Sequence, residues 1–337
     1  MPEKPRAMPE KPRSVNAAAF EPTLIWRDGR LIPFAEATTH VLSHMSARGS
    51  QVFDVALAVG RADGISVFGL REHVTRFVQS ADLMGMEDMP DVVELEAAVA
   101  DTIETNRQAS GLDPHQVGTL VVKLMASWDD PAVGLEPVTR TPVVYVAVTL
   151  LHSASVDPSD SVVPAPIRVK TAPMPKIPAS ILPPSMKVAA GYTPGIRHHL
   201  RAVDEGFDHV VFRTMDGDLA ESVTSSVLVV SDRRIVVPPV DSVLDGITRR
   251  AVLDVAQSLD IPFTVRPVAW SEVIGADELF LCSTIRSVVP FGWLDDRDLD
   301  APGPITRTLA DAMSALLAGR HPLSDRWMTP VSSLTSA

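Results

Sequence analysis

The chain has 337 residues, of which 45% are hydrophobic, so it is long enough to bury a large core and to form two domains. Its formal net charge of −12 argues against a nucleic acid or an anionic membrane as partner, because phosphate groups are bound by basic surfaces. With one cysteine, no apolar run near the ~20 residues that span a bilayer and no signal-like segment, the sequence predicts a cytoplasmic protein without disulfides.

The N-terminus contains the hexapeptide MPEKPR twice, separated by Ala7. A repeat rich in proline and charge cannot bury surface, so we expect residues 1–20 to form a disordered tail. Two hairpins are expected next, because apolar runs flank Asp28-Gly29 and Asp63-Gly64 and the Asp-Gly pair favours tight two-residue turns.

The next elements are expected to be two helices and two strands. Residues 70–86 and 92–108 have apolar side chains at helical spacing, which predicts amphipathic helices. β-Branched residues dominate 117–128 and 141–151, which predicts strands. Together with the hairpins, these elements predict a small N-terminal α+β domain over residues 21–151.

Serine, aspartate and proline dominate residues 152–166, which predicts an interdomain linker. A second domain is expected over residues 167–337, with helices at 195–206, 247–261 and 305–319 and strands between them. The predicted fold class is therefore α/β (α+β) with two domains, without the regular strand–helix alternation of a doubly wound sheet.

The residues that suggest chemistry lie in the second half. Lys187 is surrounded by prolines and small residues, where a lysine is less solvated than a surface charge. Loss of solvent favours the neutral amine that Schiff-base chemistry requires. Tyr192 and Glu221 follow, and residues 245–248 open a strong helix whose free amides suit a phosphate. Each feature alone also has an ordinary interpretation, as a surface charge or a helix cap.

No zinc-ligand spacing, Walker loop, GxGxxG or GxSxG motif is present, so no metal site is predicted. His198 and His199 are adjacent in the expected helix at 195–206 and point to different faces, so we interpret them as a surface feature and not as a chelating pair. Cys282 is predicted to be a buried packing residue.

Several segments, taken in order, resemble the class IV (fold-type IV) aminotransferases that use pyridoxal 5′-phosphate (PLP), most closely the branched-chain aminotransferases. LREHVTRFVQSADLMGM resembles the family's REHxxR helix, LDGITRRAV its LPGITR segment, FLCSTIRSVVP its late strand with a threonine turn, and PGPITRTLADAM its closing GPxT helix. The resemblance extends from about Trp26 to Trp327, and several ordered matches are more specific than one motif. It implies a smaller N-terminal domain, a larger C-terminal domain and a cofactor in the cleft between them.

The resemblance also implies roles for individual residues. Lys187 would be the catalytic residue, which forms an aldimine with PLP and then moves the proton between the substrate Cα and C4′ of the cofactor. Glu221 would pair with the pyridinium nitrogen, and Tyr192 would hydrogen-bond the phenolic oxygen of the ring. The phosphate would be held by the remaining predicted cofactor-binding residues, which are Arg76, Ile247, Thr248 and Thr284.

Departures from the family concern mainly the substrate. Arg48 replaces a loop tyrosine of the family, and Lys123 replaces an arginine of the substrate strand. Two basic groups near the pocket could bind a substrate carboxylate. An equally weighted alternative pairs Arg48 with Asp54 or with a partner subunit. The residues implied to lie near the substrate are Phe53, Arg48, Lys123 and Ile285.

Asp245 replaces the proline of the family's LPGITR segment. It either caps the following helix or weakens cofactor binding by placing a negative charge near the phosphate. The expected activity is a ping-pong transamination between an amino acid or amine and a 2-oxo acid, by a homodimer whose loops near Arg48 reach the neighbouring active site. Two alternatives remain, a PLP-dependent lyase of the aminodeoxychorismate-lyase type and a non-catalytic relative.

Overall fold

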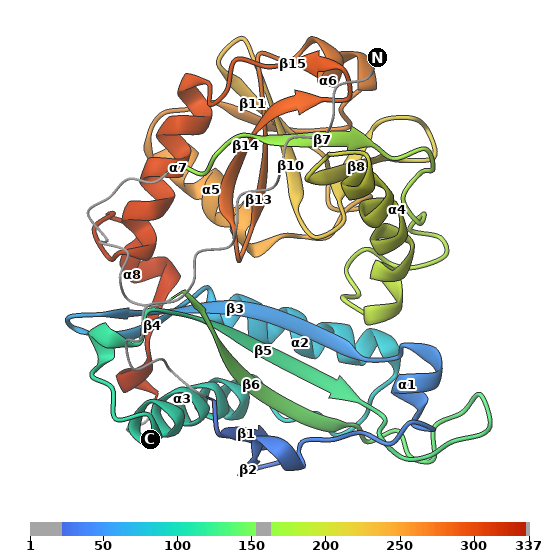
Figure 1. Ribbon diagram of the computed structural model, residues 1–337, viewed down its shortest axis with the longest axis vertical. Helices are drawn as coiled ribbons and strands as arrows, with labels where there is room; N and C mark the ends of the chain where they lie inside the picture. Colours follow the sequence, from blue (N-terminus) through green and yellow to red (C-terminus); the bar gives the residue numbers. More distant parts are fainter. Residues whose placement is uncertain (1–21, 153–162, 335–337) are drawn as a thin grey trace.

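The computed structural model describes residues 22–152 and 163–334. The expected tail, and residues 153–162 of the expected linker, lie outside this part of the chain. Two lobes, each built on one sheet, lie one above the other in Figure 1. In the described ranges, no helix combines the length and the apolar character needed to cross a bilayer.

The first lobe contains a seven-stranded sheet in the order β16-β4-β3-β5-β6-β1-β2. Both expected hairpins are present, and at the first turn Asp28 and Gly29 have φ angles of 46° and 87°, which suits a tight turn between strands. The second turn lies one residue earlier than predicted, at Ala62 and Asp63, because Gly64 already pairs with Arg61. The strands are β1 (Leu24–Arg27), β2 (Arg30–Pro33), β3 (Val52–Arg61), β4 (Gly64–Phe68), β5 (Thr119–Ser127), β6 (Val143–His152) and β16 (Met328–Pro330).

The two predicted helices of this lobe are confirmed as α2 (Leu70–Met84) and α3 (Val92–Ala109). The apolar stripe of α2 is buried in the same core as residues of β3 and β5. Gly85, with a φ of 82°, ends α2 in the left-handed conformation that glycine tolerates best. The short elements of this lobe are α1 (His44–Arg48) and the 3₁₀ turns η1 (Phe34–Glu36), η2 (Pro114–Gln116) and η4 (Val331–Ser333).

The second lobe contains a sheet in the order β12-β11-β10-β13-β14-β7-β8-β9, to which β15 adds beside β14. Its strands are β7 (Ile167–Thr171), β8 (His209–Arg213), β9 (Leu219–Ser222), β10 (Ser226–Ser231), β11 (Arg234–Val237), β12 (Phe263–Val265), β13 (Glu278–Ser283), β14 (Ser287–Leu294) and β15 (Arg297–Asp298). Its helices are α4 (Thr193–Asp204), α5 (Ile247–Ser258), α6 (Trp270–Gly275), α7 (Pro304–Leu317), α8 (Ser324–Trp327) and the 3₁₀ turn η3 (Ala189–Tyr192).

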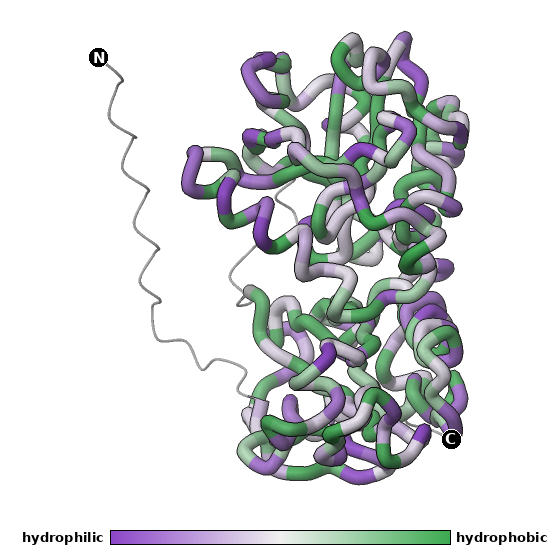
Figure 2. The backbone as a smooth tube through the Cα atoms, turned by 90° about the vertical axis from the view of Figure 1, so that its right-hand side faces the viewer, coloured by the Kyte–Doolittle hydropathy of each residue, from purple (hydrophilic) through white to green (hydrophobic). Residues whose placement is uncertain are grey.

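The predicted α/β (α+β) fold class is confirmed. Figure 2 shows the two lobes from the side, each with hydrophobic stretches running through it and hydrophilic stretches on its outer loops. The predicted domain boundaries at residues 151 and 167 stay a proposal. One strand from the predicted second domain belongs to the sheet of the first lobe. The last strand, β16, pairs with β4 and so adds the end of the chain to the first sheet.

The segment that carries Lys187 also crosses between the lobes. It connects β7 to η3 and α4, and its prolines prevent regular pairing. It is nevertheless fixed to the first lobe, because Phe53 N donates to Lys187 O at 3.1 Å and Ala189 N donates to Gln51 O at 2.8 Å. A lysine from the second half of the sequence is therefore held against strand β3 of the first half.

Candidate active site

A cavity of about 500 Å³ is lined by α2 of the first lobe and by several segments of the second half of the chain. Its walls combine apolar side chains with a few polar groups, as in most small-molecule sites. Every residue that the sequence predicted to bind a cofactor lines this cavity, namely Arg76, Lys187, Tyr192, Glu221, Ile247, Thr248 and Thr284.

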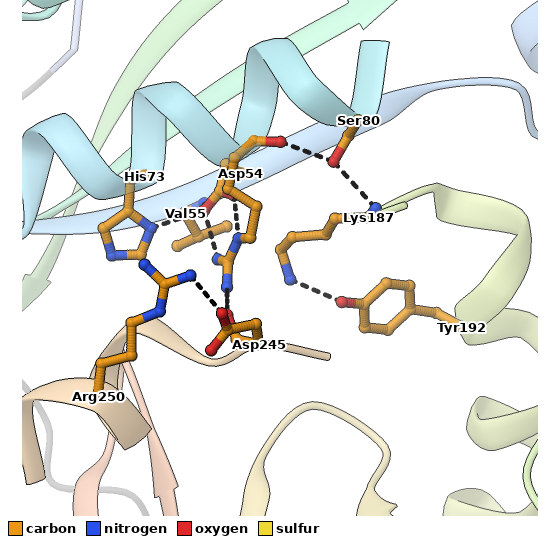
Figure 3. A network of polar contacts seen from close by, with 9 residues as sticks. Asp54, Val55, His73, Ser80, Lys187, Tyr192, Asp245 and Arg250 are labelled. Atoms are coloured by element: carbon orange, nitrogen blue, oxygen red, sulfur yellow. Dashed lines mark hydrogen bonds and ion pairs between the residues drawn. The ribbon is translucent and has the colours of Figure 1, made fainter. Parts of the chain in front are cut away.

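The amine of Lys187 lies against two aromatic rings. Its Nζ donates a hydrogen bond to Tyr192 Oη at 2.6 Å and lies 4.7 Å from the centroid of the Phe53 ring. The Phe53 and Tyr192 rings are 5.2 Å apart, so together they form one wall beside the amine. Figure 3 shows the Lys187 side chain reaching toward Tyr192, with its backbone against Ser80.

Ser80 fixes the Lys187 backbone. The Ser80 hydroxyl accepts a hydrogen bond from Lys187 N at 3.1 Å and donates one to Arg76 O at 2.8 Å. Its side chain is fully buried on α2. The sequence reasoning missed this residue, although its position four residues after Arg76 on a helix places the two on one face.

Arg76 is held by a buried carboxylate. Asp54 accepts from Arg76 Nε at 2.7 Å and from His73 Nδ1 at 2.6 Å, and both Asp54 and His73 are fully buried. Burial alone would raise the pKa of Asp54, but the charges and hydrogen bonds of Arg76 and His73 outweigh it and hold that pKa well below its usual range. For His73, burial dominates over Asp54 and lowers its pKa, so we assign a neutral ring that donates through Nδ1.

This arrangement overturns one alternative for Arg48. The sequence left open a pair between Arg48 and Asp54, but Arg48 Nη2 donates to Val133 O at 3.1 Å, at the exposed end of α1. Asp54 is instead occupied by α2. Sequence reasoning missed the role of Asp54, because its partners come nineteen and twenty-two residues later.

The start of α5 has free hydrogen-bond donors. Its N-cap residue is Gly246, which has no side chain to cap the first amides, and Thr248 Oγ1 is buried without a partner in the described residues. A Cβ at Gly246 would lie 2.8 Å from Ser226 Oγ, so only glycine fits here without a shift. Free amides and a free hydroxyl at a helix N-terminus suit a phosphate.

The side chain of Asp245 is turned away from the capping position. It pairs with Arg250, and Arg249 lies 3.6 Å away, so two arginines neutralise its charge. Of the two alternatives left open for Asp245, capping of the helix is therefore wrong. Its backbone oxygen accepts from Arg76 Nη1 at 2.9 Å, which joins α2 to the start of α5.

Glu221 lies on β9 at another part of the cavity wall. Its Oε2 accepts a hydrogen bond from Leu244 N at 3.3 Å, and its Oε1 pairs with the ammonium of Lys176, a residue that the sequence did not single out.

His198 is also buried and lines the cavity, so the interpretation of this histidine as a surface feature is wrong. Cys282 is buried, as predicted, and burial raises the pKa of its thiol to about 12.

The four predicted substrate residues are only partly brought together. Phe53 lies beside Lys187, and Lys123 Nζ is 5.6 Å from the centroid of the Phe53 ring. Lys123 itself is exposed on β5, outside the cavity wall. Ile285 is 46% exposed after β13, and Arg48 remains at the surface.

Comparison with known proteins identifies the family. The sequence model described as "Amino-transferase class IV" matches residues 51–292. The chain belongs to the class IV aminotransferases. A branched-chain-amino-acid aminotransferase of Pseudomonas aeruginosa is 26% identical over 310 residues, which cover 91% of this chain and 97% of that protein.

Solved structures of similar proteins have the same fold. A branched-chain amino acid aminotransferase from T.th., in complex with N-(5′-phosphopyridoxyl)-L-glutamate, is 28% identical with a TM-score of 0.84, over 93% of this chain and 99% of that one. The enzyme from Thermobaculum terrenum in its PLP form is 27% identical with a TM-score of 0.82, over 93% and 99%. These relatives do not favour the lyase or the non-catalytic alternative.

The class IV aminotransferases use PLP, and the cavity of this chain fits that cofactor. It offers an amine at Lys187 for the aldehyde, a carboxylate at Glu221 for the ring nitrogen, and an anion site made by Arg76 and the start of α5. The unpartnered hydroxyl of Thr248 is a donor that a phosphate oxygen would satisfy. The residues of this cavity therefore fit the polar groups of PLP.

Proposed function

We propose that this PLP-dependent aminotransferase uses Lys187 as its cofactor lysine and proton carrier and exchanges amino groups between an apolar amino acid and an acidic one. The observation that carries the proposal is the convergence of Lys187, Tyr192, Glu221, Arg76 and the start of α5 on one cavity. These groups come from both halves of the chain. Polar side chains that are distant in the sequence and line one cavity are typical of a functional site and not of unrelated surface charges.

Lys187 has the contacts that a proton carrier needs. PLP, when bound, supplies an electron sink that makes a proton on the substrate Cα removable. With the cofactor bound, the Lys187 amine would be the group that takes the proton from the substrate Cα and later releases it. The hydrogen bond to Tyr192 and the fixed Lys187 backbone orient the amine, which limits the motion needed for the transfer.

Four residues form the proposed phosphate site. Arg76 is oriented by Asp54, so its guanidinium is already positioned before any anion binds. The amides of Ile247 and Thr248 open α5, and the Thr284 hydroxyl lies in the same cavity wall. The N-terminus of α5 adds the positive end of the helix dipole.

An apolar substrate is supported by the cavity wall between β7 and η3, which carries the apolar side chains of Met174, Ile177, Ile181, Leu182 and Met186. The named relatives are branched-chain aminotransferases, and we extend that substrate class to this chain. The related T.th. enzyme binds a phosphopyridoxyl-glutamate, and we assign the distal carboxylate of an acidic substrate to Lys123, beside Phe53. Ile285 and Arg48 are proposed to line the outer part of the substrate path.

We also propose a homodimer in the cytoplasm. The lone cysteine, which is buried, is compatible with a reducing compartment. Support for the dimer comes from apolar side chains exposed on two loops that are bridged at Ser43 and Pro131. These exposed side chains are Val41, Leu42, Val133, Leu135 and Val138.

The proposal is tested by the fate of the cofactor. The purified wild-type protein should absorb in the visible range, and borohydride should bleach that absorbance and fix the cofactor on a peptide that contains Lys187. Lys187→Ala should abolish this modification and reduce transamination by at least about 10³-fold, as expected for loss of a proton carrier and covalent anchor. Lys170→Ala, a lysine outside the cavity wall, is the matched control.

The donor and acceptor are tested separately. With leucine or valine as donor and 2-oxoglutarate as acceptor, the wild type should show ping-pong kinetics. Lys123→Met should raise KM for the acidic substrate and leave KM for the apolar one unchanged. A protein that binds PLP at Lys187 but transfers no amino group from any apolar donor would refute the substrate class while leaving the cofactor site intact.

A further inference from the structure

Glu221 is not a free carboxylate in its cavity. Its Oε1 pairs with Lys176 and its Oε2 accepts from the backbone N–H of Leu244. The two side chains are mostly buried, with 21% of Lys176 and 13% of Glu221 exposed, and both line the cavity. Both carboxylate oxygens are therefore fixed, and the carboxylate cannot rotate without losing a partner.

Lys176 is itself held from two sides. Its backbone N–H donates to Arg213 O at 2.9 Å, at the end of β8, and its ammonium also donates to Ser242 O at 3.3 Å. Strand β8 pairs with β9, which carries Glu221. The Lys176 backbone is thus attached to the same pair of strands as Glu221, and its ammonium has a second partner besides that carboxylate.

The charge of Lys176 influences where a proton shared between Glu221 and a ring nitrogen would reside. When Glu221 faces a pyridine nitrogen, one proton can sit on the carboxyl group or on the ring. Lys176 attracts the adjacent carboxylate more strongly than it repels a ring proton one group farther away, because the interaction weakens with distance. The ammonium therefore favours the charge-separated form, in which Glu221 is ionised and the ring carries the proton.

We propose that Lys176 is a positioning residue, which holds Glu221 ionised and oriented so that the proton stays on the nitrogen of the cofactor ring. This inference rests on the proposed cofactor site and adds a residue to it. In this proposal Lys176 acts through Glu221, with which its ammonium pairs.

A double-mutant cycle on PLP affinity tests this role. Apoenzymes are titrated with PLP, and the dissociation constants are compared for wild type, Lys176→Met, Glu221→Gln and the double variant. Lys176→Met should weaken binding about tenfold, as expected for loss of a charged hydrogen-bond partner in a mostly buried site. It should cause no further loss in the Glu221→Gln background, where no carboxylate remains to be positioned.

Two further variants control the cycle. Lys176→Arg keeps a cation and should retain most of the affinity. Lys170→Met removes a lysine that also pairs with a glutamate, Glu205, but outside the cavity wall, and should leave PLP affinity unchanged. Lys176→Gln serves as a second neutral variant, with thermal unfolding of each apoenzyme reporting whether the fold is retained.

The position of the proton gives a readout that is independent of catalysis. With PLP labelled by ¹⁵N in the ring, the wild type and Lys176→Arg should show a protonated nitrogen, and Lys176→Met should shift toward the unprotonated value. The proposal is overturned by unchanged or tighter PLP binding in Lys176→Met, by an equal loss in the Glu221→Gln background, or by an unmoved ¹⁵N signal. A wild-type chain that binds no PLP would instead remove the proposed function, and this role with it.

Discussion

Asp54 is the buried charge on which the phosphate side of the cavity depends. It lies on β3 with no exposed surface and accepts hydrogen bonds from Arg76 and His73. A buried ion pair is costly to break from one side, because the remaining charge stays buried without its partner. The position of Arg76, and with it the anion site, therefore depends on a residue that contacts no ligand itself.

Replacing Asp54 by asparagine should lower the free energy of unfolding by about 3–5 kcal/mol, because it leaves the Arg76 charge buried and unpaired. It should also weaken PLP binding. Since the folded-state pKa of Asp54 lies below its ordinary value of 3.8, the wild type keeps this stabilisation above about pH 4 and loses it as the pH falls further, whereas Asp54→Asn has none to lose.

Urea unfolding of the apoenzyme at pH 7 and below pH 4 measures this difference. The matched control is Asp63→Asn, which changes an exposed carboxylate paired with Arg61 and should cost less than about 1 kcal/mol. Equal stability of the two variants at pH 7 would contradict the central role of Asp54.

At this scale, the sequence predicted the polar residues that line the cavity but not the residues that hold them in place. Lys187, Tyr192 and Glu221 were singled out by their place in the sequence and by the family resemblance, and they line one cavity. Ser80 and Lys176 have no such signal, because Ser80 acts across 107 residues and Lys176 across a pair of strands. Their roles arise from contacts that exist only after folding.

Helix α2 is the element that joins the proposed phosphate site to the proposed catalytic lysine. Arg76 and Ser80 are one turn apart, so one face of the helix presents the guanidinium to the cavity and the hydroxyl to the Lys187 backbone. The apolar spacing of residues 70–86 was sufficient to predict the helix. It could not predict which polar residue would meet a segment that follows about a hundred residues later.

Replacing Ser80 by alanine should remove the acceptor of the Lys187 N–H and leave that donor buried. We expect a loss of about 1–3 kcal/mol in unfolding free energy, together with faster hydrogen exchange at the Lys187 amide. Transamination should fall mainly through kcat, because the amine would be less well oriented.

Ser258→Ala is the matched control. That serine also donates within its own helix, to Val255 O at 2.7 Å, but it lies on an exposed position of α5. It should change neither stability by more than about 0.5 kcal/mol nor exchange at Lys187. Unchanged exchange at the Lys187 amide in Ser80→Ala would contradict the link between α2 and the lysine.

The whole molecule is joined by its C-terminal segment. Trp327 stacks on Phe68 at 5.7 Å, its backbone oxygen accepts from Gly69 N at 2.7 Å, and β16 then pairs with β4. The side chains of Phe68, Trp327 and Met328 are buried with residues of α5 and α7, so one core contains parts of both lobes.

The two-lobe fold could be predicted from composition and periodicity. The crossing of β16 could not, because three residues ending in proline have no strand signal.

The exposed apolar loops give the last prediction, at the scale of the assembly. Val133 is 97% exposed and Leu135 is 81% exposed, and both lie beside α1. A group of exposed apolar side chains of this kind is typical of a protein–protein contact surface. A second copy of the chain that covers this patch would desolvate it and would place a neighbouring loop close to Arg48, whose guanidinium already contacts Val133 O. The wild type should therefore sediment as a dimer.

Replacing Val133 and Leu135 together by aspartate should convert the dimer to a monomer, because four like charges would then meet or be buried at the symmetric interface. Light scattering after size exclusion measures the mass, and PLP titration measures whether the site survives. Val265→Asp, at an exposed position of β12 in the second lobe, should remain a dimer. A wild type that is monomeric at micromolar concentration, or a double variant that stays dimeric, would show that these loops are not the contact and that the active site is complete within one chain.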